Sequence, residues 1–185
     1  MKTYKEVREV VKQRLSKDRF YHSECVANRC VELATIHKVD AEAARLAGIA
    51  HDIAKEMSHE EKLEYCKENH LEVDSIEKVH PGLLHAKIGA DIAKKEFGFS
   101  EDICSAIKYH TTAKANMSQL DKVLYVADMS SQDRQFSDKS YVIELGNKDL
   151  DECVKYILKV GINQRIAQNK KIHLNSLKAL NHFMQ

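Results

Sequence analysis

Apolar residues recur at three- and four-residue steps along most of this chain. Near its beginning, Tyr4, Val7 and Val11 form such a stripe, and charged residues occupy most of the positions between them. This period is that of an amphipathic helix, which turns one face toward a core and the rest toward water. No alternating run of β-branched residues is long enough to predict a strand. The pattern therefore predicts an all-α fold.

Capping residues indicate where the helices begin and end. Asp40 is a natural N-cap, and Ser58 with Glu61 forms a capping-box pattern. Pro81 suits the first turn of a helix, and Gly98 suits the position just after its end. The expected helices cover approximately residues 4–15, 18–37, 40–54, 58–69, 81–97, 100–110, 118–129, 150–168 and 176–184, whereas residues 70–80 and 130–148 are expected to be irregular.

The length and the absence of an internal repeat favour a single domain. We expect one helical bundle over residues 1–185, with the segments that carry candidate chemistry within residues 19–134. The helices over residues 150–184 are expected to pack on that bundle. Six glycines and one proline exclude collagen-like and linker-rich chains.

Charge and cysteine content exclude several further classes of protein. The 29 basic and 28 acidic residues nearly cancel, so no overall field attracts nucleic acid or an anionic membrane. Residues 1–15 are too charged for a signal peptide, and no apolar stretch is long enough to span a membrane. Five cysteines without a C-x-x-C pattern argue against a disulfide scaffold or a thiolate zinc site. We therefore expect a cytoplasmic protein with no nucleic-acid or membrane partner; its oligomeric state, a homodimer included, stays open.

Several histidines and aspartates lie on or beside faces that should be buried. Any one buried histidine is more often a satisfied core or capping residue than a ligand. Here, however, the set comes from five helices, and no arginine or lysine on the same faces neutralises it. Helical bundles build metal sites from inward side chains of this kind. The set comprises His22, His51, Asp52, His85, His110 and Asp128, and the six other histidines (His37, His59, His70, His80, His173 and His182) are expected to be exposed to solvent.

The donor types narrow the choice of metal. Imidazole and carboxylate without thiolate suit iron, manganese, cobalt or zinc. Six ligands exceed what one catalytic ion takes while it keeps an open position, so either two ions bind or some histidines contact the substrate. On a regular helix, His51 and Asp52 diverge by about 100°. The carboxylate therefore either bridges two ions, or a distorted helix end brings both groups to one ion.

These residues follow the His…His-Asp…Asp order of a known family. His22, His51-Asp52 and Asp128 match that order, and the chain resembles the HD-domain metal-dependent phosphohydrolases. A fuller match indicates the YqeK-like bacterial group. It rests on R-F-Y-H-S (19–23), A-G-I-A-H-D-I-A-K (47–55), L-L-H-A-K-I-G-A (83–90), I-K-Y-H-T-T (107–112) and L-Y-V-A-D-M (124–129).

The resemblance implies an HD-type helical bundle that cleaves diadenosine tetraphosphate symmetrically into two ADP, through hydroxide on a bound metal, which is iron in that group. It implies metal ligation by His22, His51, Asp52 and Asp128, and it places His85 and His110 at a second ion or on the phosphates. The catalytic residues are then Asp52, Lys55, His85, His110 and Arg134, and the substrate would contact Arg19, His22, Lys55, His85, His110, Asp128 and Arg134.

Two segments depart from the pattern of that group. An acidic-proline stretch is replaced by residues 130–133, S-S-Q-D, while Arg134 and Phe136 are kept. The glycine expected after His-Thr-Thr is Ala113. Both changes border the expected nucleotide pocket, so they bear on the substrate more than on the metal chemistry.

The residues themselves support cationic contacts to phosphate and leave alternatives. Lys55 follows His51 by four positions, so its ammonium group can reach past a metal to a phosphate oxygen; it could equally be a surface residue that ends a helix. Arg134 offers a bidentate guanidinium, or is an ordinary loop arginine. No Walker loop, Rossmann glycine pattern or serine elbow is present. The alternatives are a phosphatase of another nucleotide such as a nucleoside monophosphate, a regulatory module that binds nucleotide without turnover, and a helical scaffold.

Overall fold

The computed structural model describes residues 1–184, and the part of the chain it describes contains helices and no strand. The predicted all-α fold is therefore confirmed. The elements are α1 (Tyr4–Arg14), α2 (Lys17–His37), α3 (Ala41–Ala50), α4 (His59–Glu68), α5 (Ser75–Val79), the 3₁₀ turn η1 (Pro81–Leu83), α6 (Leu84–Phe97), α7 (Glu101–Tyr109), α8 (Gln119–Ser130), α9 (Lys139–Lys148), α10 (Leu150–Ala167) and α11 (Leu174–Phe183).

Most of the predicted caps are present. Asp40 accepts hydrogen bonds from the backbone N–H groups of Glu42 and Ala43, and Ser58 forms its capping box with Glu61. Gly98 ends α6 in the left-handed conformation, with φ of 68°. These local contacts satisfy backbone groups that a helix end leaves free, so they fix the helix boundaries.

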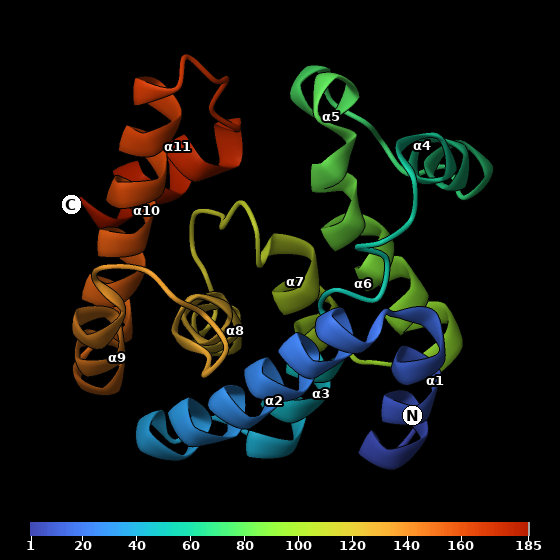
Figure 1. The fold of residues 1–185 in the computed structure, drawn as a ribbon, viewed down its shortest axis with the longest axis horizontal. Coiled ribbons are helices and arrows are strands. Elements are labelled where there is room, and N and C mark those ends of the chain that lie inside the picture. The colour runs from blue at the N-terminus through green and yellow to red at the C-terminus, as the bar shows by residue number, and fades with distance from the viewer. Residues whose placement is uncertain (185) are drawn as a thin grey trace.

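The centre of the molecule is built by α2, α3, α7 and α8, which pack against one another (Figure 1). Close approach of α3 to α2 depends on Gly48, because a Cβ atom there would lie 2.7 Å from the Cα of Ala27. In Figure 1, α9, α10 and α11 lie on the left, and α1, α4, α5 and α6 lie on the right. The C-terminal helices pack one after another outward from α8: α10 packs on α8, and α11 packs on α10. Within residues 1–184 there is no helix whose length and apolarity would let it cross a membrane.

Two segments expected to be irregular contain helices. In residues 70–80, Asp74 and Glu77 form a capping box that starts α5. In residues 130–148, α9 buries only Val142 and Gly146, which pack toward α8 and α10. Both predictions of irregular structure were wrong because these short helices depend on capping and on tertiary contacts, and neither produces a long apolar stripe.

The predicted third helix is also shorter than expected. It ends at Ala50 and is followed by turns over residues 51–56, so Ile53 and Ala54 are buried from a turn and not from a helix. Lys62 fills the space beneath this turn. It is only 3% exposed, and its ammonium group donates to the carbonyl oxygens of Lys55, at 3.0 Å, and Met57. Lys62 thereby holds the segment that carries His51, a role that the sequence did not reveal.

Candidate metal centre

The structure brings all six predicted histidines and aspartates into one cluster at the centre of the bundle. His22 comes from α2, His85 from α6 and Asp128 from α8. The other three lie just past helix ends, and all but Asp128 are almost completely buried. The six residues are His22, His51, Asp52, His85, His110 and Asp128, and we call them the central cluster.

Three of the four histidines are held in the same way. The Nδ1 atom of each lies within hydrogen-bond distance of the carbonyl oxygen three residues earlier: His51 to Gly48 at 2.7 Å, His85 to Gly82 at 2.5 Å and His110 to Ile107 at 2.7 Å. A carbonyl can only accept, so Nδ1 carries the proton and Nε2 keeps a free electron pair. This tautomer is the one that ligates a metal through Nε2.

His22 is held by a carboxylate. Its Nδ1 atom lies 2.7 Å from Oδ2 of Asp133, and the Ser131 hydroxyl donates to the other oxygen of Asp133 at 2.8 Å. A carboxylate behind a ligating histidine orients the ring and raises its basicity. In the sequence, residues 130–133 stand out only as a departure from a pattern, so the role of Asp133 was not predicted. No periodicity marks this loop residue, and only the fold places it behind His22.

Asp52 lies between two groups of histidines. Its Oδ2 atom is 3.4 Å from Nε2 of His51 and 3.9 Å from Nε2 of His22. Its Oδ1 atom is 3.2 Å from Nε2 of His85 and 3.6 Å from Nε2 of His110. The distorted helix end after Ala50 turns His51 and Asp52 into the same space, and the carboxylate also faces both ways. The structure shows the distorted helix end, and whether Asp52 bridges two ions stays a prediction.

The donor set fits a cation. Nε2 of His22, Nε2 of His51 and Oδ1 of Asp52 are buried and have no hydrogen-bond partner among residues 1–184. Nε2 of His85 and Nε2 of His110 face each other at 3.1 Å, although both carry free electron pairs. Converging lone pairs without donors are costly to bury unless a positive charge lies between them. Two triads, His22–His51–Asp128 and His51–Asp52–His110, have all their ligating atoms within 4.8 Å of one another.

Protonation states within the cluster also suit a cation. Burial alone would raise the pKa of Asp52, but the facing histidines, His51 first among them, lower it well below its ordinary value. Burial opposes ionisation of Asp128 as well, yet His22, whose Nε2 atom lies 3.2 Å from Oδ1 of Asp128, and the nearby positive charge lower its pKa far below the usual range. Burial lowers the pKa of His85 to about 4, so this imidazole is neutral at neutral pH. Two carboxylates and a neutral imidazole thus face the centre.

Three cationic side chains lie beside the central cluster, and they are the three that the resemblance implied. Nη1 of Arg19 lies 3.1 Å from Oδ2 of Asp52, and Nζ of Lys55 lies 3.2 Å from Nε2 of His85. Arg134 forms an ion pair with Asp128. Their side chains are 31%, 37% and 36% exposed, respectively. They therefore form a cationic rim, Arg19–Lys55–Arg134, between the central cluster and solvent.

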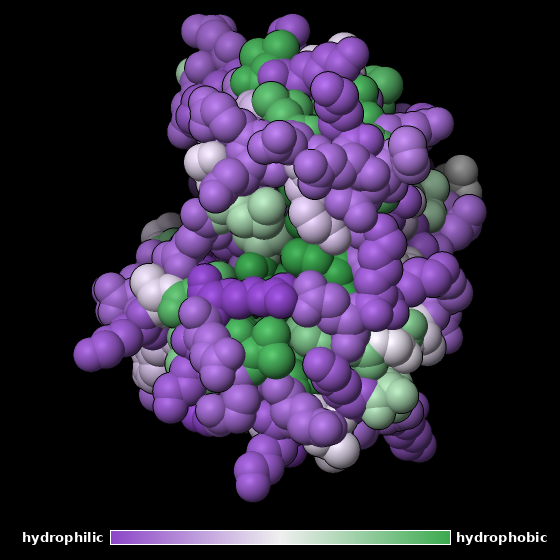
Figure 2. All heavy atoms as spheres, turned by 90° about the vertical axis from the view of Figure 1, so that its right-hand side faces the viewer, coloured by the Kyte–Doolittle hydropathy of each residue, from purple (hydrophilic) through white to green (hydrophobic). Residues whose placement is uncertain are grey.

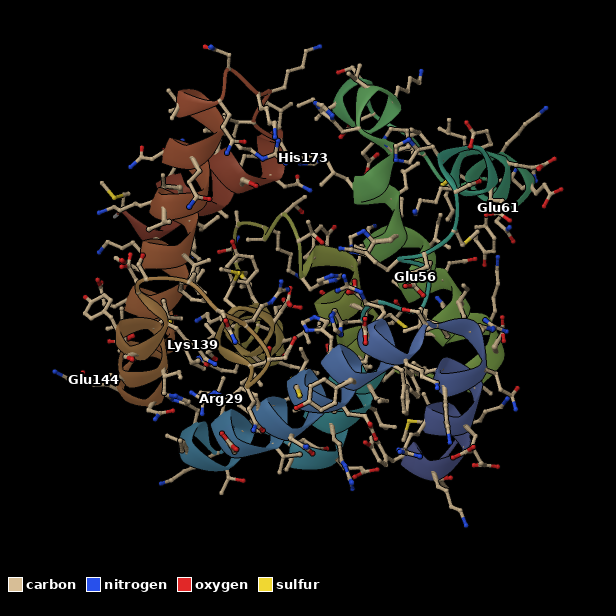
Figure 3. All side chains as sticks on the ribbon, viewed as in Figure 1. Arg29, Glu56, Glu61, Lys139, Glu144 and His173 are labelled. Atoms are coloured by element: carbon tan, nitrogen blue, oxygen red, sulfur yellow. The ribbon has the colours of Figure 1, made fainter. Side chains whose placement is uncertain are left out.

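The turn that carries Lys55 is also tied to the start of α2. Glu56 accepts from the backbone N–H and the hydroxyl of Ser16, both at 2.6 Å. Figure 3 shows Glu56 on the segment between α3 and α4, beside α6. Ile53 and Met57 of this turn line a hollow of about 420 Å³. Figure 2 shows apolar surface between polar side chains near the centre of the face that it draws. The central cluster does not line this hollow.

One histidine expected to be exposed is buried. His173 is 8% exposed and caps α11, and its Nε2 atom lies 2.9 Å from Oδ2 of Asp74. Figure 3 shows His173 at the end of the C-terminal region that faces α5. Asp74, Glu77 and His173, which we call the outer cluster, also have ligating atoms within 4.8 Å of one another. The prediction for His173 was wrong because the contact between α11 and the start of α5 joins residues far apart in the sequence.

The departure at Ala113 has a structural cost. Ala113 is buried and adopts the left-handed conformation, with φ of 57°. Glycine takes this conformation freely, whereas a residue with a Cβ pays roughly 1–2 kcal/mol. At Ala113 the backbone thus adopts the conformation that glycine would favour.

The fold and the site together define an all-helical protein with a His/Asp metal centre of the HD type. A model of the family described as "HD domain" matches residues 19–132. A protein of Bacillus subtilis named "Bis(5'-nucleosyl)-tetraphosphatase, symmetrical" is 35% identical over 145 residues, which are 78% of this chain and 77% of that protein. A protein of Halalkalibacterium halodurans with the same name is 31% identical over 177 residues, 95% of this chain and 94% of the relative.

A solved structure supports the same assignment. It is described as a predicted HD superfamily hydrolase involved in NAD metabolism from Clostridium acetobutylicum. Its sequence is 31% identical, and it superposes with a TM-score of 0.96 over 100% of this chain and 98% of that one. The chain belongs to the HD domain family, and this membership indicates a metal-dependent hydrolase with a divalent metal cofactor.

Proposed function

We propose that this protein hydrolyses dinucleoside tetraphosphates, with diadenosine tetraphosphate as substrate, symmetrically into two nucleoside diphosphates. The observation that carries the proposal is that the cationic rim lies directly beside the buried central cluster. A polyphosphate chain needs cations along its length. The three cations of the rim lie at one edge of the central cluster. The names of the relatives from Bacillus subtilis and Halalkalibacterium halodurans supply the substrate.

The central cluster would hold one or two divalent ions. His22, His51, Asp52 and Asp128 are the proposed ligands, and His85 and His110 either complete a second site or contact phosphate. A divalent cation supplies Lewis acidity and lowers the pKa of bound water from 15.7 toward about 7. Iron is the metal we propose, because the resemblance implies it and the imidazole and carboxylate donors suit it; manganese, cobalt and zinc suit the same donors.

The protein's own groups then bind and orient the phosphates. Lys55 donates to the free electron pair of His85 at 3.2 Å, and an anionic phosphate oxygen would compete for the same ammonium group. Arg134 presents a planar guanidinium that suits bidentate contact with phosphate. Arg19 faces the same space from α2, beside Asp52. These contacts would hold the tetraphosphate so that its central anhydride lies over the central cluster. Cleavage of that anhydride leaves a diphosphate on each nucleoside.

The test is to purify the protein with and without oxygen, measure its metal, and separate the products of a nucleotide panel by chromatography. The panel contains diadenosine tetraphosphate, NAD and nucleoside monophosphates. We expect ADP as the sole product of the tetraphosphate, and in ¹⁸O-labelled water the label should enter ADP. ATP plus AMP would contradict symmetrical cleavage. Inorganic phosphate from monophosphates, without turnover of any dinucleotide, would replace the proposal with a monophosphatase.

A further inference from the structure

Two adjacent threonines follow His110, and their hydroxyl groups make different contacts. The Thr111 hydroxyl lies 3.2 Å from Nε2 of His110 and 3.3 Å from Nε2 of His85. The Thr112 hydroxyl instead donates to the carbonyl oxygen of Ala113 at 3.1 Å. Both side chains are half-buried, so the two threonines differ in direction and not in depth. Of these two hydroxyls, that of Thr111 lies against the central cluster.

The backbone around Thr111 is held on both sides. The N–H group of Ala113 donates to the carbonyl oxygen of Tyr109 at 2.8 Å. The Ser176 hydroxyl of α11 donates to the carbonyl oxygen of Thr112, also at 2.8 Å. Because these contacts fix the backbone, they also fix the point from which the Thr111 side chain reaches the imidazoles.

The facing imidazoles of His85 and His110 need two donors. Each ring donates from Nδ1 to a carbonyl, so in the neutral form both Nε2 atoms are acceptors, and they lie 3.1 Å apart. Oδ1 of Asp52, which faces the same two atoms, is an acceptor as well. Among residues 1–184, the donors within reach are the Lys55 ammonium group, 3.2 Å from Nε2 of His85, and the Thr111 hydroxyl. A hydroxyl has one proton, and Lys55 already donates to His85, so the proton of Thr111 is available to His110.

A comparison with His51 shows what the hydroxyl adds. His51 lies just past a helix end, as His110 does, and a carbonyl holds the Nδ1 atom of each at 2.7 Å. The Nε2 atoms of His51 and His22 have no hydrogen-bond partner among residues 1–184. The Nε2 atom of His110 has one, so the buried electron pair of this ring is already satisfied by the protein.

We propose that Thr111 is a positioning residue of this site: its hydroxyl donates to Nε2 of His110 and keeps the imidazoles of His110 and His85 side by side. The inference rests on the proposed function, in which these two rings lie beside the reacting phosphates. Without the hydroxyl, two acceptors 3.1 Å apart would share one ammonium group, so one ring would lose its hydrogen bond or turn away. The Lys55 ammonium group would then be held between the two rings and be less available to a phosphate oxygen.

The test removes the hydroxyl and keeps the shape of the side chain. Thr111→Val replaces the hydroxyl with a methyl group, Thr111→Ser keeps the hydroxyl, and Thr112→Val makes the first change at the neighbouring threonine as the matched control. The first readouts are kcat and KM for diadenosine tetraphosphate and the metal content per chain. The second is the ¹⁵N resonance of His110 Nε2 in zinc-loaded protein that contains ¹⁵N-labelled histidine, assigned by its loss in His110→Gln. This resonance reports whether the nitrogen accepts a hydrogen bond, and its measurement needs no turnover.

We expect Thr111→Val to lower kcat by about tenfold, the effect of leaving one buried acceptor without its donor, with a smaller change in KM and wild-type metal content. The Nε2 resonance of His110 should shift in Thr111→Val and stay in place in the other two variants. Thr111→Ser and Thr112→Val should keep kcat within about threefold of wild type.

An unshifted His110 resonance in Thr111→Val would overturn the inference. So would equal kcat values in Thr111→Val and Thr112→Val, or a Thr111→Ser protein as slow as Thr111→Val. If wild-type protein cleaves no dinucleotide while the His110 resonance still shifts in Thr111→Val, the proposed function fails and the hydrogen bond that positions His110 stands.

Discussion

Two clusters in this molecule bring histidine and carboxylate atoms to within 4.8 Å of one another, and they differ in where the imidazole proton lies. In the central cluster, Nδ1 of His51 donates to a carbonyl, so in the neutral imidazole Nε2 keeps the free electron pair. In the outer cluster, Nδ1 of His173 accepts the backbone N–H of Asn175 at 3.1 Å, so Nε2 must carry the proton. That proton faces Asp74, although the 2.9 Å approach is not aligned as a hydrogen bond.

The two clusters also differ in whether their polar groups have partners. Glu77 of the outer cluster is already paired with Lys87 at 2.7 Å, and Asp74 accepts the backbone N–H groups that start α5. Its carboxylates therefore already have partners, and the contact between Asp74 and His173 joins the start of α5 to the start of α11. The central cluster keeps buried electron pairs without donors. Both clusters thus bring ligating atoms close together, and we propose that the hydrogen bond behind each histidine decides which cluster can hold a metal.

The largest expected difference between the clusters is in catalysis. Asp52→Ala removes the carboxylate that lies between both histidine groups, so we expect turnover to fall by at least about 10³-fold. Asp74→Ala removes a carboxylate of the outer cluster, which shares no residue with the central cluster, and should leave turnover within about twofold of wild type. Steady-state rates on diadenosine tetraphosphate check both. An Asp52→Ala protein with wild-type turnover would remove the central cluster from the mechanism.

Substitution of the cations beside the two clusters should give the next largest difference in rate. Lys55→Ala and Arg134→Ala each remove one donor to the phosphates, and we expect rates lower by roughly 10²–10³ with metal content near wild type. Lys87→Ala removes the cation of the outer cluster and is the matched control. Equal, small effects of Lys55→Ala and Lys87→Ala on kcat would reduce Lys55 to a surface residue.

Metal removal should destabilise the protein through the central cluster alone. A ligand that binds only the folded state at 100 times its dissociation constant contributes about 2.7 kcal/mol. At roughly 2–4 °C per kcal/mol for a chain of this size, chelation should lower the melting temperature by about 5–10 °C. Asp52→Ala should no longer respond to the chelator, whereas Asp74→Ala should respond as wild type does. Thermal unfolding followed by circular dichroism measures both.

A smaller effect is expected at Lys62, which supports the turn that carries the central cluster. Lys62→Met leaves the carbonyl oxygens of Lys55 and Met57 without their donor, and an unsatisfied buried group costs about 1–3 kcal/mol. We expect a loss of about 2 kcal/mol in unfolding free energy and a fall of several-fold in kcat. Lys67→Met, on the exposed face of α4, should change neither quantity. A stable, fully active Lys62→Met would show that the turn holds its shape unaided.

The residues of the central cluster were easier to predict from the sequence than the residues that hold them in place. His22, His51 and Asp128 could be found because apolar periodicity assigned them to inward faces, and the family pattern gave their order. Asp133 and Lys62 lie in a loop and in a charged helix, where periodicity says nothing about burial. Their roles arise only when α8 approaches α2, and when the turn after α3 folds over α4.

The same limit explains the errors in the fold. The long helices carry their own apolar stripes and caps, so their positions were predictable from local physics. In contrast, α9 depends on packing of Gly146 against Val126, where a Cβ atom would come within 2.8 Å. His173 was assigned to solvent because its partner, Asp74, lies far away along the chain.

If the tautomer separates the metal centre from the outer cluster, the number of metal ions per chain should differ between two histidine variants. His51→Ala and His173→Ala are purified anaerobically beside wild type, and the metal is measured by mass spectrometry. The account predicts that His51→Ala loses its metal while His173→Ala retains the wild-type content. Full metal content in His51→Ala, or metal lost on substitution of His173, would contradict it.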